Sequence, residues 1–433
     1  MKCLFLILLA GMMIFAMNAC GKAESPDTNL AGQEKLDKKV VNVFTPMEKS
    51  DPNAKNIARS AFEKTVIMAE DQLGVTVEYQ TYTAADYQEK TYDEVLINRA
   101  HSNMDDLYLL NPDALLTLGE EGELADLSGL KCVKNLREAV KTANTVDGKL
   151  VGIPQEVVAY GLFVNKDMFD KYKLKLPNTP EELLACCETF KKKGIETPIG
   201  ANRWWLECFV FAQGFADLYN GGNTDAEIEA INSGKVKLSD YMRPGFEFLQ
   251  ELIDREYIDA EKAYVSEALE GERQDFLAQK TPIVMAYWGA ANTDTAYGST
   301  DFNMRVIGFP SKRGQMPVVP ITGYGVGEEC AHKEDAMAVL DVMLSDKALK
   351  VYAEENKVIS PSKNVEVDCV DALKPLNEKV NEGVYVLGSN ANLAVEQWGN
   401  TCLIVRDLLK GASVDECMEK FDKLQEEKIK EQD

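Results

Sequence analysis

The segment DGKLVGIP at residues 147–154 decides the fold, together with LFVNKDMF at 162–169 and LPNTPEE at 176–182. Apolar residues at 150–154 and 162–164 within the first two segments predict buried strands. The third segment predicts a helix start, with Thr179 as N-cap, Pro180 at the first helical position and Glu182 completing a capping box. A sheet therefore begins past residue 150 and leads into helices.

Upstream of this stretch the pattern already alternates between strands and helices. Short apolar or alternating runs at 40–44, 75–80 and 106–110 predict strands, and helical spacing at 54–73 and 84–98 fills the intervals. Strands joined by crossover helices predict a mostly parallel sheet covered on both faces. Such sheets bind ligands outside the carboxyl ends of their strands.

Downstream, the chain to about residue 300 is predicted to be mainly helical, with one strand at 282–287. A strand rich in small residues begins at Gly323 and leads into helices at 333–344 and 346–355. Two helical stretches, 391–410 and 414–430, close the chain.

Composition restricts the classes of function. The 433 residues allow two or three domains, and 71 acidic against 47 basic residues leave a net charge of −24. Such a surface repels phosphate backbones, which argues against nucleic-acid binding. Only two histidines occur, so a histidine-rich metal site is not expected, and no cofactor motif is present.

The amino terminus indicates secretion. Lys2 precedes an apolar stretch from Cys3 to Met17 that is too short to cross a ~30 Å hydrocarbon core, which is typical of a signal peptide over residues 1–19. The sequence Met17-Asn18-Ala19-Cys20 resembles the lipobox of bacterial lipoproteins, although Met17 stands where leucine is usual. Cys20 is then the acylated, palmitate-bearing residue, and residues 20–39 form a polar tether to the membrane. The alternative is an ordinary signal peptide with a buried cysteine.

Eight cysteines follow Cys20, without any C-x-x-C pair. Several lie within helical patterns of a long chain, so we expect buried free thiols in place of disulfides.

Three pieces of the chain, in order, resemble the extracellular solute-binding proteins of carbohydrate ABC importers, the maltodextrin-binding-like group (family 1). The first piece is the opening stretch, which matches a G-K-x-x-x-x-P strand, a Y-N-K-D-x-F corner and a P-x-T-W-x-E helix start. The others are Phe276–Met285, similar to the F-x-x-G-K-x-A-M strand entry, and Ala331–Ala336 with Ile359–Lys363, similar to a K-x-x-E-A helix and a P-x-x-K turn. Val164, Pro180 and Gln279 depart from the family's Tyr, Trp and Gly.

The resemblance implies an α/β, two-lobed, type II periplasmic-binding-protein-like fold, with a mainly parallel sheet in each lobe and a helix-rich second lobe. Lobe 1 is expected at 40–152 plus 322–362, and lobe 2 at 153–321 plus 363–433. Prolines near 154, 317–320 and 361 suit the extended crossings between lobes. It also implies a monomeric, extracytoplasmic binding protein that passes a sugar or oligosaccharide to ABC permease subunits.

The expected ligand contacts are aromatic and polar. An indole stacks on the C–H face of a sugar ring while amides and carboxylates bind its hydroxyls. All four tryptophans fall in the expected second lobe, and polar candidates follow strand ends. The alternative is that the tryptophans are core residues. The predicted contacts are Phe44, Asn111, Gln155, Glu156, Tyr160, Asn202, Trp204, Trp205, Trp288, Tyr324 and Trp398.

No catalytic motif is present: the sequence lacks G-x-S-x-G, H-E-x-x-H and the P-loop pattern. We therefore predict that the chain is not an enzyme. A secreted glycan-cleaving enzyme remains a rival, because it would share cleft tryptophans and needs only two carboxylates. A second alternative keeps the fold but binds a peptide or polyamine, or serves a sensor.

Overall fold

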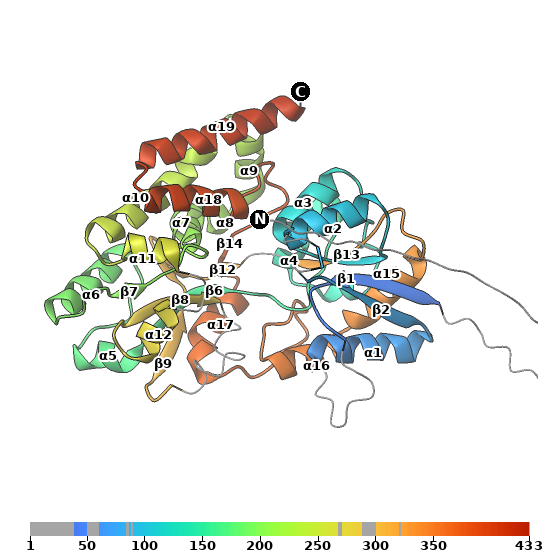
Figure 1. Cartoon of the computed structure of the whole chain (residues 1–433), viewed down its shortest axis with the longest axis horizontal. Helices are drawn as coiled ribbons and strands as arrows, with labels where there is room; N and C mark the ends of the chain where they lie inside the picture. Colours follow the sequence, from blue (N-terminus) through green and yellow to red (C-terminus); the bar gives the residue numbers. More distant parts are fainter. Residues whose placement is uncertain are drawn as a thin grey trace, which may run out of the picture. The chain divides into compact units, whose positions relative to one another are not determined.

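We analysed a computed structural model of the chain (Figure 1). The structure describes residues 39–49, 60–83, 86–87, 90–266, 271–287, 300–319 and 322–432. Cys20, the expected tether up to residue 38 and Trp288 therefore lie outside the described residues, as does the first part of the helix expected at 54–73.

The first sheet has four strands in the order β13-β3-β1-β2. Strand β1 pairs in parallel with β2 and β3, whereas β13 pairs antiparallel with β3. The chain thus returns to this sheet after leaving it for almost half its length. The strands are β1 (Val40–Thr45), β2 (Thr76–Thr81), β3 (Leu107–Leu110) and β13 (Gly323–Val326).

Helices cover both faces of this sheet, with α1 and α16 on one side and α2 and α3 on the other (Figure 1). Local signals set their ends: Ser60 caps α1 and Gly74 ends it at φ 68°, while Thr91 and Glu94 form a reciprocal capping box on α2. The helices are α1 (Ala61–Leu73), α2 (Tyr92–His101), α3 (Pro112–Glu120), α4 (Glu138–Ala143), α15 (Lys333–Met343) and α16 (Asp346–Asn356), with a 3-10 turn at Lys131–Asn135.

The second sheet is mixed, which corrects the expectation of mainly parallel pairing. Its central strand β6 pairs antiparallel with β8, β9 and β12, and only β7 with β8 and β12 with β14 are parallel. Several of its strands are too short or too polar for the sequence pattern to show them. The strands are β6 (Tyr160–Asn165), β7 (Ile199–Gly200), β8 (Ile283–Tyr287), β9 (Met304–Ile307), β12 (Val318–Val319) and β14 (Val386–Leu387).

Two small hairpins accompany the sheets. Strands β4 (Thr145–Val146) and β5 (Lys149–Leu150) form one, and β10 (Phe309–Ser311) and β11 (Gly314–Met316) form the other. The expected strand over 150–154 is thus mostly extended chain beyond β5.

The helix-rich part around the second sheet agrees with expectation. Helix α7 is buried along its whole length and packs on α10 and α18. A Cβ on Gly245 would lie 2.4 Å from Cα of Val210, so the α7–α10 crossing requires glycine there. The helices are α5 (Lys166–Lys171), α6 (Pro180–Lys192), α7 (Glu207–Gly214), α8 (Ala216–Asn220), α9 (Thr224–Asn232), α10 (Leu238–Asp254), α11 (Ala260–Val265), α12 (Gly271–Leu277), α17 (Lys374–Asn381), α18 (Trp398–Leu409) and α19 (Val414–Gln432), with a 3-10 turn at Asp371–Leu373.

The capping prediction at α6 is confirmed in part. Thr179 accepts from the Glu182 amide at 3.3 Å, but the Glu182 carboxylate accepts from Asn178 N in place of Thr179 N. The eight cysteines after Cys20 are free thiols, seven of them buried.

Three extended segments run side by side between the two sheets. Ile153 and Tyr324 exchange both backbone hydrogen bonds, at 3.1 and 2.9 Å, and Val157 N donates to Ile359 O at 2.8 Å. A Cβ on Gly323 would lie 2.7 Å from Ile153 N, so the close approach of these segments depends on glycine. The expected crossing points at 153–154 and 361 thus fall within a hydrogen-bonded bundle.

Gln279, which replaces the family's glycine, has a φ of 56°. Since the left-handed conformation costs an L-residue about 1–2 kcal/mol, Gln279→Gly is expected to raise the free energy of unfolding by about 0.5–1 kcal/mol after the entropy of glycine in the unfolded chain is subtracted. Denaturant unfolding measures the change. Gln279→Ala is the control, because it also removes the side-chain contact to Asn165 but keeps the Cβ. Equal stabilities of the two variants would contradict the strain.

Candidate functional site

Three aromatic rings meet beside the first turn of α18, and we call Tyr160, Trp205 and Trp398 the aromatic cluster. The Tyr160 ring lies 5.4 Å from the Trp398 ring and 5.8 Å from the Trp205 ring, centroid to centroid. Strand β6 supplies Tyr160 at its first residue and α18 supplies Trp398 at its first residue. A Cβ on Gly388 would lie 2.4 Å from Trp398 Cζ3, so the indole packs directly on this backbone. Trp398 and Tyr160 remain partly exposed.

Glu396 holds its carboxylate at the amino terminus of α18. Its Oε1 accepts from Gly399 N and its Oε2 accepts from Asn400 N, both at 2.9 Å. Free amides and the helix dipole stabilise a negative charge at this end of a helix. Glu396 is therefore a preorganised anion.

Asp113 reaches the same place from the other sheet. It lies in the first turn of α3, behind Asn111 and Pro112, which directly follow β3. Its carboxyl hydrogen bonds to Glu396. Gly399 permits the approach, because a Cβ there would lie 2.7 Å from Asp113 Oδ2 and 3.2 Å from Glu396 Oε2. We call Asp113 and Glu396 the carboxyl pair.

The two acids share a proton. Burial and the adjacent Glu396 raise the pKa of Asp113 to about 9. Asp113 is therefore protonated at neutral pH. Asp113 Oδ1 is buried and has no hydrogen-bond partner among the described residues. An unsatisfied buried oxygen costs about 1–3 kcal/mol. The ligand-free contact between α3 and α18 is destabilised by about that amount.

Further contacts close the junction between α3 and α18. Asn392 Nδ2 donates to Thr142 O at 2.6 Å, and Lys428 of α19 pairs with Glu120 of α3 at 2.8 Å. The space left beside the carboxyl pair is about 10 Å³, which is close to the smallest cavity that holds one water. A larger ligand therefore requires α3 and α18 to separate.

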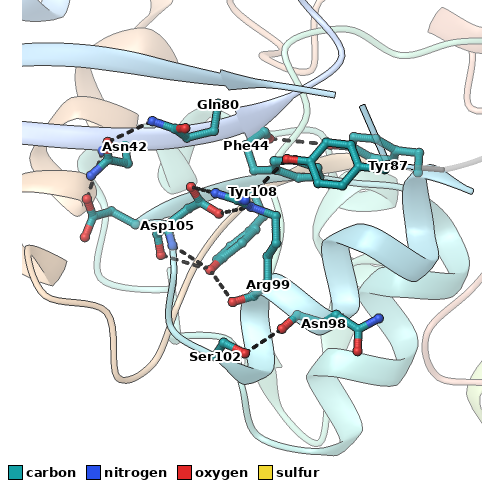
Figure 2. Close-up of polar contacts among 11 residues, drawn as sticks. Asn42, Phe44, Gln80, Tyr87, Asn98, Arg99, Ser102, Asp105 and Tyr108 are labelled. Carbon is teal, nitrogen blue, oxygen red and sulfur yellow. Dashed lines mark hydrogen bonds and ion pairs between the residues drawn. The ribbon is translucent and has the colours of Figure 1, made fainter. Parts of the chain in front are cut away.

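Of the predicted contacts, Phe44 lies in the interior of the first sheet. Its ring stacks on Tyr92 at 5.3 Å, and the Arg99 guanidinium lies 4.9 Å from the ring centroid. Arg99 in turn pairs with Asp105 at 2.7 Å (Figure 2). The Phe44 side chain is 0% exposed and leaves no surface for a ligand in this conformation.

Other polar candidates are also occupied by the fold. Gln155 Nε2 donates to Thr65 Oγ1 at 2.8 Å, and Asn202 Nδ2 donates to Glu272 at 2.9 Å. The Tyr324 ring is buried and stacks on Phe62 at 5.6 Å. Asn111, two residues before Asp113, is partly exposed, and its side-chain amide donates to Asp93 at 3.0 Å.

The remaining candidates lie in different places. Trp204 is held by Arg406 and Arg203, whose guanidinium carbons lie 4.2 and 5.1 Å from its ring centroid. Glu156 lines a separate cavity at the crossing segments. The structure thus brings together Tyr160, Trp205 and Trp398, and it does not bring Phe44, Gln155, Asn202 or Tyr324 to them.

Sequence reasoning missed both members of the carboxyl pair. Asp113 follows the end of β3 by three positions, just beyond Asn111, and Glu396 precedes Trp398 by two. An acid in the first turn of a helix that follows a strand was a usable signal for Asp113. Within the described ranges, no group of three or more His, Cys, Asp or Glu side chains could hold a metal ion. The same ranges contain no helix that is long and apolar enough to cross a membrane.

Comparison with solved structures defines the fold. The chain superimposes on a chitin oligosaccharide binding protein with a TM-score of 0.70 and 18% identity, over 91% of this chain and 99% of the other. The architecture is the two-lobed type II fold of periplasmic binding proteins, as the sequence predicts.

Sequence comparison gives the family. The pattern of the bacterial extracellular solute-binding proteins matches residues 52–350, and the chain belongs to this family. A fructooligosaccharide ABC transporter substrate-binding protein of Streptococcus pneumoniae is 25% identical over 363 residues, 75% of this chain and 63% of the relative. An uncharacterised ABC transporter extracellular-binding protein of Pyrococcus horikoshii is 28% identical over 228 residues, 49% of this chain and 51% of the relative. The chain thus spans between half and two thirds of the length of these relatives.

Proposed function

We propose that this solute-binding protein captures a sugar or oligosaccharide between α3 and α18 and delivers it to the permease of an ABC transporter. The observation that carries the proposal is the aromatic cluster beside a carboxyl pair with an unsatisfied oxygen. Rings and carboxylates together match the two faces of a sugar, its C–H surface and its hydroxyls. The streptococcal relative is a fructooligosaccharide transporter's binding protein and the solved neighbour is a chitin oligosaccharide binding protein, which supports a carbohydrate.

The carboxyl pair suggests how ligand and conformation are coupled. Without ligand, contact between α3 and α18 needs a proton on Asp113 and leaves Oδ1 unsatisfied. A sugar placed between them donates hydroxyl hydrogens to both acids. The ligand then stabilises the closed state, in which α3 and α18 lie close together, more than the open state. This difference in stabilisation is what a ligand-driven closure requires.

We propose that the two sheets mark the two lobes, with boundaries at 40–152 plus 322–362 and at 153–321 plus 363–433. The strand orders support this division, since β13 joins the first sheet whereas β12 and β14 join the second. The hydrogen-bonded crossing segments at 153–157, 324 and 359 are then the hinge. Trp288 stays a proposed contact, because it directly follows β8 of the second sheet.

A polyamine or other cationic ligand is the second candidate, and the carboxyl pair is the observation that favours it. Two acids beside aromatic rings also form a site for an ammonium group, through charge and cation–π attraction. A thermal-shift screen of the purified chain against oligosaccharides, polyamines and short peptides separates the candidates. Stabilisation by oligosaccharides supports the carbohydrate proposal, whereas stabilisation by polyamines or peptides alone overturns it.

The rival glycan-cleaving enzyme would hold its two carboxyl groups about 5–10 Å apart across the scissile bond. The chain instead belongs to a family of solute-binding proteins. We therefore propose binding without bond cleavage. Incubation of the ligand with the chain for hours, followed by chromatography, tests this, and release of shorter products contradicts it.

We propose that acylated Cys20 anchors the chain outside the cytoplasm as a monomer on a tether of residues 20–39. Cys20→Ser is expected to move the chain from the membrane fraction to the medium, because no acyl chain remains to hold it. Fractionation and incorporation of labelled palmitate measure this. Cys3→Ser is the control, since Cys3 lies within the expected signal peptide. Membrane retention of the Cys20 variant contradicts the anchor.

A further inference from the structure

A second cavity lies at the crossing segments, away from the carboxyl pair. Its volume is about 240 Å³, and it shares no lining residue with the α3–α18 junction. Its walls come from α4, from the crossing residues Pro154–Val157, Val319 and Thr322, and from the stretch between the end of α17 and β14. Elements of both sheets therefore meet around it.

The middle of this crossing cavity is apolar. Val140, Val157, Val319, Val380 and Leu387 line it, and all but Val157 are buried. Its volume equals that of about eight water molecules in the liquid. An aliphatic chain of a few carbons fits such walls better than water does.

Two opposite charges face this apolar space. Arg137 lines the cavity, and its Nε donates to Ser360 O at 2.9 Å. Glu156, which is partly exposed, lines it too, and within the described ranges its carboxylate has neither a hydrogen bond nor an ion pair. Arg137 likewise makes no ion pair to a described carboxylate. Charged groups in an apolar environment are normally paired.

The two charges do not compensate each other. Burial raises the pKa of Glu156 to about 7, with no offset from a nearby cation. Burial also lowers the pKa of Arg137, and the charges that oppose this are those of Tyr385 and Glu366. No ion pair joins Arg137 to Glu156 among the described residues, so both groups are open to a ligand in the cavity that they line.

We propose that the crossing cavity is a second ligand site, which takes a small linear zwitterion whose ammonium and carboxylate groups are separated by an aliphatic chain. The ammonium pairs with Glu156, the carboxylate pairs with Arg137, and the chain lies on the valines and Leu387. An ω-amino acid has this chemistry, whereas a dipeptide carries the same two charges but places a polar amide between them, which the apolar walls do not satisfy. Since its walls come from both sheets, an occupant also braces the crossing segments.

Isothermal titration calorimetry of the purified chain tests the site, with 6-aminohexanoate as the probe. We expect 6-aminohexanoate to saturate the site at a concentration of about 10 mM. Hexanoate lacks the ammonium and hexylamine lacks the carboxylate, so each is expected to bind at least tenfold more weakly. Alanylalanine distinguishes a dipeptide from an ω-amino acid, because its polar amide is expected to weaken its binding.

Variants assign the binding to the cavity. Glu156→Gln and Arg137→Gln are each expected to weaken 6-aminohexanoate at least tenfold, and Val157→Phe is expected to abolish binding by filling the space. Glu188→Gln, an acid on α6 outside the cavity, is the matched control. Absence of saturable binding by the wild type, or unchanged binding in both charge variants that remain folded by circular dichroism, overturns the proposal. If 6-aminohexanoate and an oligosaccharide compete for one site, the zwitterion has no site of its own and this proposal is overturned. The proposed carbohydrate site is not contradicted by that result.

Discussion

Trp398→Ala is expected to raise the dissociation constant for the saccharide about thirty- to hundredfold, or about 2–3 kcal/mol. The indole is the partly exposed member of the aromatic cluster at the helix amino terminus, 5.4 Å from Tyr160 and directly on the backbone of Gly388. Its loss removes a flat apolar surface that the fold holds rigidly in place. Titration calorimetry measures the change.

Two further variants separate ligand contact from a structural role of Trp398. Trp398→Phe keeps a smaller flat ring and is expected to recover part of the affinity. Tyr172→Ala removes an aromatic ring of intermediate burial that packs on Phe190, outside the site, and is expected to leave affinity unchanged. A folded Trp398→Ala chain with wild-type affinity means that the indole is a core residue and that the proposed site is wrong.

Asp113→Asn is expected to change stability and affinity in opposite directions. The pKa of Asp113 is about 9 in the folded chain and about 3.9 in an unfolded one, so the folded state binds more protons between these values. The free energy of unfolding of the wild type therefore falls as pH rises through this window, by at most about 1.4 kcal/mol per pH unit. Asn carries no such penalty. Ligand-free Asp113→Asn should equal the wild type near pH 4 and exceed it progressively toward pH 8.

The same substitution removes an acceptor from the ligand. We expect the saccharide to bind Asp113→Asn about tenfold more weakly, and a cationic ligand to lose considerably more because a full charge pair disappears. Thermal unfolding across pH and calorimetry measure the two effects. Asp126→Asn is the control. Despite some burial, the hydrogen bonds from Ser128 and Leu150 hold the pKa of Asp126 below its usual range. This variant should therefore be less stable than the wild type near neutral pH, and the difference should disappear in acid. A stability difference for Asp113→Asn that does not change with pH contradicts the shared proton.

The first sheet and its helices were predictable because local signals and tertiary structure agree there. The helix that ends at Leu73 and strands such as β1 and β3 follow from patterns within a few residues. The second sheet was harder, because short strands such as β12 and β14 owe their conformation to pairing partners far away in the chain. No local pattern specifies such pairs.

The candidate site shows the same limit. Tryptophans could be picked from the sequence, and the rings of Trp205 and Trp398 both pack on Tyr160. The orientation of a side chain at a strand end could not be read, so Phe44 and Tyr324 were chosen although both point into the core. The contact between Asp113 and Glu396 depends on how α3 and α18 come together, and on Gly399, which lacks a side chain at the point of contact. Only the folded arrangement reveals it.

The most direct test of the account is a crystal structure of the chain with the saccharide that stabilises it most. The account predicts a sugar ring against Trp398, with hydroxyl groups within hydrogen-bond distance of Asp113 and Glu396, and the carboxyl pair no longer in contact. A saccharide bound elsewhere, with Asp113 still bonded to Glu396, would contradict it.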